Sequence, residues 1–569
     1  MNCPICASNR TRPVECPKRL FFRCDFCGFS WADPTDLPEE ETSRRRYRLH
    51  QNNEDHEGYI AFLSRIIDRA LMYIGNPRNT LKVLDWGSGP NPIGVKLLKQ
   101  RGFEAVPWDP LFANGDPPGK EVFDLAFCIE TAEHFTHPVR DFRSFALSLK
   151  PGGWGFVHTH ISPPGDEEFL QWWYIQDITH VSFYSEKSLE ILGAIGSLSF
   201  MALEDENFAV FRRPLPVLVG GGINLDIEGR PHGKLIIRDS NPGRIHFSPG
   251  GCGRNIAENL SRLGLGTELV SVVGDDVFGE GLKESSKAGG IGIGGIHVSK
   301  GKVTSAYLSL LDNQGDMAAA VSGMDIFDDF TPKIAEKALE QAAASAYNRS
   351  FGADPEVPFS KLLIDGNLLP ETSLFIRRRF PDLPCWFDPV SVTKIRRIAA
   401  YQQGIVLNGL EGIKCNILEA QALIGDVGLD LETPDYIERL LQSIKVCLKE
   451  ISIVYITLGS DGALRLDASG AVLFKGLSQE PVSATGAGDA FLAASLRQRI
   501  IGNKNTLNTA ADLIAGTVAA YLTLKSPQAV SPDMNPEALE SLILEWNHES
   551  QGTQVGNAPH APLTTYRFY

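Results

Sequence analysis

Long apolar runs are missing from this sequence. No stretch is long enough to cross a bilayer as a helix, and the N-terminus lacks the apolar core of a secretory leader. Positive charge is also in short supply, because 54 Lys and Arg face 69 Asp and Glu and leave a net charge of −15. This balance disfavours a protein whose main role is to coat nucleic acid. We therefore expect a cytoplasmic protein with no membrane partner.

Cysteine is sparse and unevenly placed. Ten cysteines are spread over 569 residues, and four of them, Cys3, Cys6, Cys24 and Cys27, form two C-x-x-C pairs. Two such pairs fit a reducing compartment and one tetrahedral site for a structural Zn²⁺ better than they fit a disulfide framework. The sequence therefore predicts a zinc ribbon over residues 1–33. Contact of this ribbon with RNA or protein is an alternative role, for which the basic side chains would be Arg10, Arg12, Lys18, Arg19 and Arg23.

A chain of this length exceeds what one hydrophobic core supports, so two or three domains are expected. After the ribbon we predict a charged linker over 34–56, a first domain over 57–213, a second over 215–547 and a disordered polar tail over 548–569. Both large domains alternate helical and strand patterns. This alternation predicts an α/β fold with two doubly wound parallel sheets.

The first large domain carries a strand that enters a glycine-bearing turn, with Asp85, Gly87 and Gly89, and a later acid, Asp109. The glycines let backbone approach a ligand, and such an acid accepts hydrogen bonds from a ribose diol. By itself this pattern is compatible with a dinucleotide fold. Two further segments, residues 123–135 and 149–155, make the domain resemble the class I S-adenosylmethionine-dependent methyltransferases.

That resemblance implies roles for particular residues. Asp85, Gly87 and Gly89 would line the methionine end of S-adenosylmethionine, Asp109 would hold its ribose, and Glu130 and His134 would face the methyl-transfer cleft. One departure is Asn91 in place of the third motif glycine, so a domain that only senses the cofactor is an alternative. His180, in the aromatic segment 172–181, is either a base or a packed core histidine.

The second large domain ends with a glycine-led turn into a helix, Gly486, Ala487, Gly488 and Asp489. Small residues let backbone N–H groups approach a phosphate, and the positive end of the following helix adds to this anion hole. Asp489 stands beside it, where a base would take a proton from a substrate hydroxyl. The pattern predicts phosphoryl transfer, a reaction that depends on positioning and charge neutralisation.

Four further segments strengthen this interpretation: residues 217–226, 248–264, 414–419 and 457–462. Together with 482–491 they resemble the ribokinase-like (PfkB) family of sugar and nucleoside kinases, over residues 215–547. The resemblance implies ATP and Mg²⁺ as partners of the site. It implies substrate contacts from Asn224, Asp226, Gly250, Gly251 and Asn255, and ATP or Mg²⁺ contacts from Lys414, Asn416, Glu419, Thr457, Gly459 and Gly462, with Asp489 as the catalytic base.

Within this family the sequence looks closest to the pseudouridine kinases, on residues 250–259, 304–326 and 387–391. That likeness implies phosphorylation of the 5′-hydroxyl of a nucleoside, and a kinase for adenosine, ribose or a related sugar is the alternative. Ser483 replaces an acid that holds a monovalent cation in several relatives, so potassium activation is not expected. Family members can also form homodimers through a small lid sheet, expected here over 226–247 and 302–321.

Overall fold

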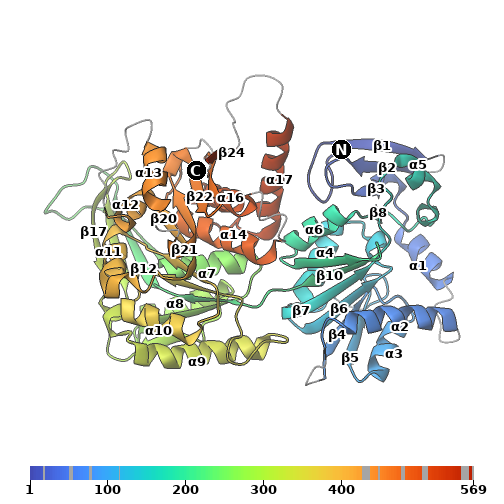
Figure 1. The fold of residues 1–569 in the computed structure, drawn as a ribbon, viewed down its shortest axis with the longest axis horizontal. Helices are drawn as coiled ribbons and strands as arrows, with labels where there is room; N and C mark the ends of the chain where they lie inside the picture. Colours follow the sequence, from blue (N-terminus) through green and yellow to red (C-terminus); the bar gives the residue numbers. More distant parts are fainter. Residues whose placement is uncertain are drawn as a thin grey trace.

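Four β-sheets organise the computed structural model, which describes residues 1–16, 19–49, 56–75, 80–113, 116–425, 436–445, 449–475, 481–502, 510–552 and 563–566. A six-stranded and a ten-stranded sheet each form the centre of one α/β body, and two four-stranded sheets flank them (Figure 1). Among the described residues, no helix has the length and apolarity needed to span a membrane.

The six-stranded sheet has the order β5-β4-β6-β7-β10-β9, with β4, β5, β6 and β7 parallel and β10 antiparallel to both of its neighbours. Side chains alternate across a strand, so neighbouring residues of β4 pack on opposite faces of the sheet. Val83 packs in one hydrophobic cluster with α2 and α3, and Leu84 in another with α4 and α6. The doubly wound prediction is confirmed here. The strands are β4 (Lys82–Trp86), β5 (Glu104–Trp108), β6 (Phe123–Ile129), β7 (Leu149–His158), β9 (Ser199–Glu204) and β10 (Phe208–Arg212), and the helices are α2 (Glu57–Leu71), α3 (Ile93–Gln100), α4 (Pro138–Ser148), α5 (Asp166–Gln171) and α6 (Glu186–Ile195).

The cysteine-rich N-terminus forms a sheet of order β1-β2-β3-β8. Its own strands are β1 (Thr11–Cys16), β2 (Arg19–Cys24) and β3 (Ser30–Ala32), whereas β8 (Ser182–Phe183) comes from the middle of the chain. The four predicted zinc ligands lie in one hydrophobic cluster with α4 and α6. The module therefore folds onto the first α/β body as part of its core.

The predicted linker contains regular structure. A 3-10 helix, η1 (Pro34–Asp36), is followed by helix α1 (Glu40–Leu49). Arg44 pairs with Glu40 one turn earlier, and Arg46 pairs with Asp177 at 2.9 Å. The charged run thus fixes a helix beside the methyltransferase-like body.

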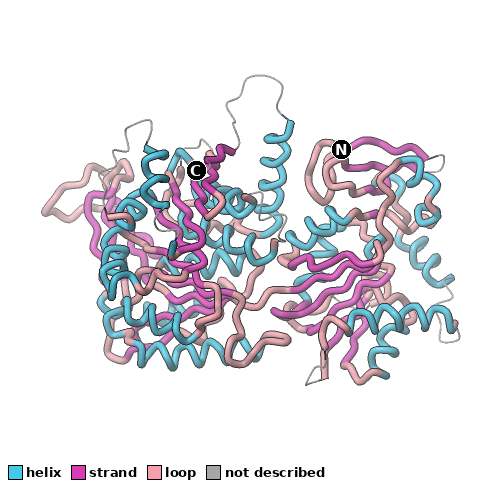
Figure 2. The backbone as a smooth tube through the Cα atoms, viewed as in Figure 1, coloured by secondary structure: helices cyan, strands magenta, loops and turns pink. Residues whose placement is uncertain are grey.

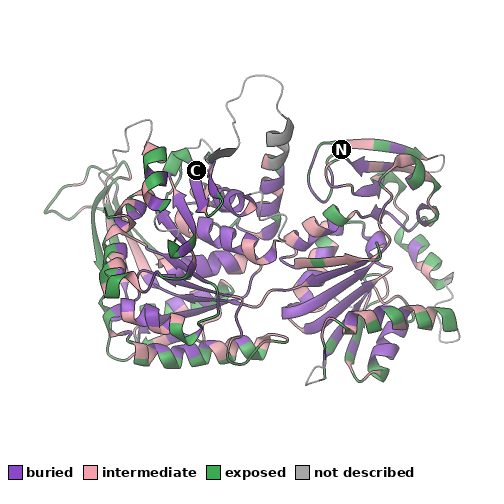
Figure 3. Cartoon of the chain, in the orientation of Figure 1, coloured by how far each residue is buried: buried purple, intermediate pink, exposed green. Residues whose placement is uncertain are grey.

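The ten-stranded sheet has the order β15-β14-β11-β18-β19-β20-β21-β22-β23-β24, parallel from β15 to β21 and antiparallel beyond it. One face packs on α9, α10 and α11 and the other on α7, α14 and α16, which confirms the second doubly wound prediction. Figure 3 shows burial concentrated along both central sheets. The strands are β11 (Val217–Gly220), β14 (Thr267–Gly274), β15 (Ile296–Ser299), β18 (Lys361–Asp365), β19 (Cys385–Asp388), β20 (Leu410–Asn416), β21 (Ile451–Thr457), β22 (Ala463–Asp467), β23 (Gly470–Phe474) and β24 (Leu563–Tyr566).

The helices of this second body lie on both faces of its sheet (Figure 2). They are α7 (Cys252–Arg262), α8 (Val277–Ala288), α9 (Pro332–Arg349), α10 (Pro370–Arg379), α11 (Val392–Ala400), α12 (Ile417–Leu423), α13 (Tyr436–Ile444), α14 (Ala487–Ile501), α16 (Ala511–Leu524) and α17 (Pro536–Gly552). The glycine-rich run 289–295 connects α8 to β15, as an ordinary helix-to-strand connection.

The lid sheet has the order β13-β12-β16-β17, built from β12 (Asn224–Pro231), β13 (Gly243–Gly250), β16 (Ala306–Leu311) and β17 (Met317–Gly323). These bounds confirm the lid expected over 226–247 and 302–321. The prediction of a disordered tail over 548–569 is wrong at two places. Helix α17 continues to Gly552, and β24 pairs with β23 at the edge of the large sheet. The remaining residues of that tail lie outside the described ones.

The two α/β bodies meet through a buried arginine. Arg497 of α14 is fully buried and donates to the carbonyl oxygens of Leu263 and Ala194 and to the hydroxyl of Ser197. Its guanidinium also pairs with Glu540 of α17 at 2.6 Å. Since Ala194 and Ser197 belong to the first body, this side chain joins the two halves of the chain.

Candidate functional sites

Four neighbouring parallel strands of the large sheet end in polar residues. Asp365, Asp388, Asn416 and Thr457 are the last residues of β18, β19, β20 and β21. Ligands of open α/β sheets bind at this carboxyl edge. The edge therefore marks one candidate active site, to which the two glycine-led helices α7 and α14 add their N-termini.

Asp489 lies in the first turn of α14, directly after the predicted anion hole. Gly486, the residue that precedes the helix, has φ 82°, and a Cβ there would lie 1.9 Å from the carbonyl oxygen of Ala529. Only glycine fits this turn without strain. The turn leaves the backbone N–H groups at the start of α14 without intrahelical partners, which is the geometry that binds a phosphate.

The carboxylate of Asp489 joins the two motifs that the sequence placed far apart. Its Oδ1 accepts from the thiol of Cys252 at 3.0 Å and its Oδ2 from Nδ2 of Asn255 at 3.0 Å, both from α7. Desolvation raises the pKa of Asp489 to about 7, and the negative charge of Asp388 acts in the same direction. A carboxyl group with this pKa can take up a proton near neutral pH, as a general base must.

Lys414 balances the carboxylates of this site. Its Nζ lies 2.7 Å from Asp388 Oδ2, and a Cβ on Gly488 would lie 3.0 Å from the same Nζ. Burial by itself would lower the pKa of Lys414, but the carboxylates, Asp388 first, raise it above its ordinary value. The ammonium group therefore stays charged beside the anion hole, where the sequence predicted a phosphate contact.

The predicted substrate residues meet where the lid joins the core. Asn224 and Gly250 are paired across β12 and β13, and Asn224 Nδ2 donates to Asp226 Oδ1 at 2.6 Å. Burial raises the pKa of Asp226. A Cβ on Gly250 would lie 2.2 Å from Asp226 Oδ2, so this glycine gives the carboxylate its room. Gly251, with φ 99°, is the N-cap residue that directly precedes α7, next to this cluster.

Asn416 and Glu419 form a capping box that the sequence analysis did not foresee. The backbone N–H of Glu419 donates to Asn416 Oδ1 at 2.9 Å, and that of Asn416 donates to Glu419 Oε2 at 2.8 Å. Burial, followed by the charge of Asp388, raises the pKa of Glu419. Thr457 ends the adjacent strand, and Gly459 and Gly462 shape the following loop with φ of 61° and 102°.

Two buried aspartates were missed by the sequence analysis. Asp388 holds Lys414, and Asp365 Oδ2 accepts from the backbone N–H groups of Gly222 and Gly253 at 2.8 and 2.7 Å. Asp365 thereby joins the loop after β11 to the start of α7. Each aspartate ends a buried strand at the sheet edge, and this position was the signal that could have identified them.

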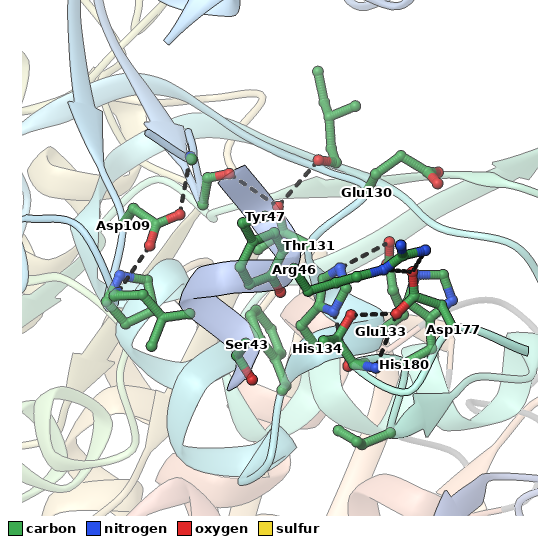
Figure 4. A pocket seen from close by; sticks show the side chains of 18 of the residues that line it. Ser43, Arg46, Tyr47, Asp109, Glu130, Thr131, Glu133, His134, Asp177 and His180 are labelled. Carbon is green, nitrogen blue, oxygen red and sulfur yellow. Dashed lines mark hydrogen bonds and ion pairs between the residues drawn. The ribbon is translucent and has the colours of Figure 1, made fainter. Parts of the chain in front are cut away.

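A second candidate site is a cavity of about 1160 Å³ in the first body, at the carboxyl ends of β4, β5 and β6 (Figure 4). Of the predicted cofactor residues, Gly87, Gly89, Asp109 and Glu130 line it. The N–H of Gly89 donates to Asp109 Oδ2 at 2.9 Å, and both glycines have positive φ. A Cβ on Gly87 would lie 2.1 Å from Thr131 Cγ2. Glycine at position 87 is therefore required by the packing of Thr131 against this turn, whose residues line the cavity where the predicted cofactor would bind.

Asp85 and Glu130 differ in their surroundings. Asp85 packs against α3, where a Cβ on Gly94 would lie 2.8 Å from its Oδ2. Burial, and then the charge of Asp109, raise the pKa of Asp85 to about 7. Glu130 faces the cavity, with Oε1 2.7 Å from His158 Nδ1. Asp85 thus lies against α3 and is not among the residues that line the cavity, whereas Glu130 belongs to the cavity wall.

Helix α1, within the predicted linker, forms part of the same cavity. Ser43, Arg46 and Tyr47 line it, and the ring of Tyr47 lies 5.1 Å from the ring of His134 (Figure 4). The sequence predicted a charged linker here, because charged runs of this kind are usually solvated, and gave no sign that the helix would line the cavity. The residues that α1 contacts, such as Asp177 and His134, come from other segments of the chain.

The four cysteines of the N-terminal module fit one metal ion. Their sulfur atoms lie within 4.8 Å of one another, with Cys3 to Cys27 at 3.6 Å and Cys6 to Cys24 at 3.5 Å. Tetrahedral zinc with Zn–S bonds of about 2.3 Å requires sulfurs about 3.8 Å apart. The set is therefore compatible with the predicted zinc ribbon and would supply four thiolates to the ion.

Three of the arginines considered for RNA contact are used inside the protein. Arg12 and Arg23 pair with Asp166, and Arg19 donates to the carbonyl oxygens of Asp177 and His180, both at 3.1 Å. Lys18, the lysine of that set, lies outside the described residues. The ribbon is thus tied to the loop before β8, which forms one wall of the cavity.

The fold and the site define a sugar or nucleoside kinase joined to a methyltransferase domain. The chain belongs to the pfkB family of carbohydrate kinases, whose family model matches residues 218–534. A methyltransferase-domain model matches residues 55–193.

Characterised relatives resemble the chain over about half of its length. It is 31% identical over 278 residues to pseudouridine kinase of Escherichia coli (strain K12), covering 49% of this chain and 81% of the relative. It is 25% identical over 286 residues to guanosine-inosine kinase of Exiguobacterium acetylicum, covering 50% and 86%. A solved ribokinase from Thermotoga maritima aligns with a TM-score of 0.45 and 19% identity, over 58% of this chain and 99% of that one.

Proposed function

We propose that the second body transfers a phosphoryl group from ATP to the 5′-hydroxyl of pseudouridine. The observation that carries this proposal is the position of Asp489, held by Cys252 and Asn255 at the start of a glycine-led helix, with its pKa near 7. Similarity to a pseudouridine kinase over 81% of that relative supports the choice of substrate.

In the proposed reaction Asp489 takes the proton of the substrate hydroxyl, and the oxygen of that hydroxyl attacks the γ-phosphorus of ATP. The new O–P bond forms as the bond to the β-phosphate oxygen breaks, and ADP leaves. Backbone N–H groups at 486–488 and the ammonium of Lys414 would neutralise the charge that develops on the phosphoryl oxygens. Asn416 and Glu419 would provide oxygen ligands, directly or through water, to Mg²⁺ on the phosphates.

A panel of compounds tests the substrate. ADP release by the full chain is measured with pseudouridine, uridine, adenosine, guanosine, inosine and ribose. The proposal expects the highest kcat/KM for pseudouridine. A preference for guanosine or inosine would instead favour the second candidate, a kinase for another ribosyl compound, which similarity to a guanosine-inosine kinase supports.

Asp489→Asn tests the role of the base. Loss of a general base slows turnover by roughly 10²–10⁴-fold, so we expect a reduction of that size in kcat on the best substrate. Asp533→Asn, an exposed carboxylate outside the site, is the matched control and should leave kcat unchanged. Normal turnover of the Asp489 variant would contradict the assignment.

We propose that the first body binds S-adenosylmethionine and transfers its methyl group to an acceptor in the cavity. Gly87, Gly89 and Asp109 would hold the cofactor, which supplies an electrophilic methyl group when bound. Calorimetry on the full chain tests binding, and Asp109→Ala should abolish the heat signal. An absence of binding to the unaltered chain would favour a non-catalytic module that contacts RNA or protein.

We also propose that the lid sheet forms a homodimer. Phe247, Leu308 and Val321 of this sheet are exposed, and an exposed group of large apolar side chains is typical of an interaction surface. Sedimentation of the full chain and of Phe247→Glu tests this, since the variant should sediment as a monomer. Identical sedimentation of both would contradict it.

A further inference from the structure

A glutamate and two histidines come together in the wall of the methyltransferase cavity. Glu133 and His134 belong to the 3-10 helix η2 (Ala132–His134), and His180 comes from the loop before β8. One potential ligand atom of each lies within 4.8 Å of the other two. Figure 4 shows the three side chains converging beside Asp177, on the side of the cavity away from Asp109.

Both histidines are oriented by backbone carbonyl groups. Nδ1 of His134 lies 2.8 Å from the carbonyl oxygen of Thr179, and Nδ1 of His180 lies 2.7 Å from that of Tyr174. A carbonyl oxygen only accepts hydrogen bonds, so Nδ1 carries the proton in each ring. In the neutral imidazole the lone pair is then on Nε2. Metal-binding histidines are commonly held in this way, with the other ring nitrogen donating to a carbonyl or carboxylate.

Glu133 is buried, and only one of its two carboxylate oxygens accepts a hydrogen bond from a described residue. Its Oε2 accepts from the hydroxyl of Thr159 at 2.9 Å, while its Oε1 has no hydrogen-bond partner among the described residues. This oxygen lies 3.9 Å from Nε2 of His134, too far for a hydrogen bond. A buried carboxylate oxygen without a partner is costly, and a cation is the group that would compensate it.

We propose that Glu133, His134 and His180 bind a divalent transition-metal ion. Two atoms that are each about 2 Å from one ion lie at most about 4 Å apart, so an ion can reach both Glu133 Oε1 and His134 Nε2, 3.9 Å apart, at a wide ligand–ion–ligand angle. Two imidazoles and one carboxylate suit zinc, iron or another first-row metal, whereas Mg²⁺ and Ca²⁺ prefer oxygen ligands throughout. This site is separate from the four cysteines, which form their own cluster.

The proposed ion would keep a coordination position toward the cavity, because the three ligands are also cavity-lining residues. Three protein ligands and one open position are typical of catalytic rather than structural metal sites. A bound divalent ion lowers the pKa of a coordinated hydroxyl. The acceptor class that this site would take is therefore a hydroxyl-bearing compound, an inference that rests on the proposed methyl transfer.

The N-terminal ribbon holds one of the proposed ligands in place. Arg19 donates to the carbonyl oxygens of Asp177 and His180, and the N–H of Val181 donates to the carbonyl oxygen of Glu133 at 2.8 Å. The loop that carries His180 is thus fixed from both sides. This arrangement gives the ribbon a role in shaping the cavity.

Metal stoichiometry of the full chain tests the proposal. The protein is stripped with a chelator, loaded with Zn²⁺, passed through a desalting column and analysed for zinc and protein content. We expect His180→Gln to retain one equivalent of zinc fewer than the unaltered chain. Cys24→Ser should also lose one equivalent, the zinc of the four cysteines, and keep the zinc of the proposed site. His137→Gln, an exposed histidine three residues from His134, is the matched control and should retain the full amount.

A second measurement avoids dependence on one variant. Co²⁺ is added to protein whose cysteines already hold zinc, and its visible absorption is followed. The proposal expects a spectrum of nitrogen and oxygen ligation that Glu133→Gln and His134→Gln abolish while their far-ultraviolet circular dichroism is retained. Equal zinc content in His180→Gln and the unaltered chain, or a cobalt spectrum unaffected by both substitutions, would overturn the proposal. Calorimetry with S-adenosylmethionine reports separately on the proposed methyltransferase function.

Discussion

The kinase site and the methyltransferase cavity both lie at the carboxyl ends of parallel strands, but they are assembled differently. The kinase site uses strand ends and two helix N-termini from one continuous domain. The cavity also needs α1 and the loop before β8, which the ribbon holds. The first site is therefore expected to respond mainly to local changes, and the second to changes in distant segments.

The largest expected effect concerns the junction of the two bodies. Arg497→Met removes a buried cation and leaves the carboxylate of Glu540 without its guanidinium partner, while the carbonyl oxygens of Leu263 and Ala194 keep the hydrogen bonds that Ser197 donates to them. Loss of one partner from a buried pair costs about 3–5 kcal/mol, and we expect the free energy of unfolding in urea to fall by that amount. Arg143→Met breaks an exposed pair with Glu537 and is the control, worth less than about 1 kcal/mol. Equal effects would mean that the buried junction does not stabilise the chain.

A pair of glycine substitutions compares the two sites directly. Gly486→Ala places a Cβ 1.9 Å from the carbonyl oxygen of Ala529, whereas Gly89→Ala meets nothing within 4 Å. Displacement of the proposed anion hole should lower kinase kcat/KM by about 10²-fold. Gly89→Ala carries only the strain of a left-handed residue, about 1–2 kcal/mol, which calorimetry with S-adenosylmethionine would detect. A normal kinase rate in Gly486→Ala would contradict this difference.

The smallest expected effect is a shift of the kinase pH profile. Because the pKa of Asp489 is raised to about 7 and its ionised form is the proposed base, kcat/KM should fall as pH drops below about 7. Cys252→Ala removes a donor to this carboxylate, which should move the acidic limb up by about one pH unit. Cys252→Ser keeps a donor and serves as the control. A limb at the same pH in Cys252→Ala would show that the thiol does not tune the base.

The grouping of the proposed kinase residues was largely predictable because these residues stand in short contiguous motifs. Gly486 to Asp489 and Gly250 to Asn255 each combine a turn and a helix start, and the helix start fixes where their groups point. Asp388 and Asp365 were missed because a lone aspartate at a strand end has no local pattern. Their roles appear only when neighbouring strands align at the sheet edge.

The methyltransferase cavity was less predictable from sequence. Its glycine turn and Asp109 were readable, but Tyr47, Glu133 and His180 come from three segments separated by more than forty residues. The zinc ribbon was predicted from its cysteine spacing, while its completion by β8 was not. Pairing of such a short strand depends on tertiary packing rather than on local propensity.

The central claim is that Asp489 lies within reach of the hydroxyl that becomes phosphorylated. The direct measurement is a crystal structure of the full chain with pseudouridine and a non-hydrolysable ATP analogue. The account predicts a carboxylate oxygen of Asp489 about 2.6–3.2 Å from the 5′-oxygen of the nucleoside. A 5′-oxygen on the opposite side of the pocket, beyond reach even through one water molecule, would contradict it.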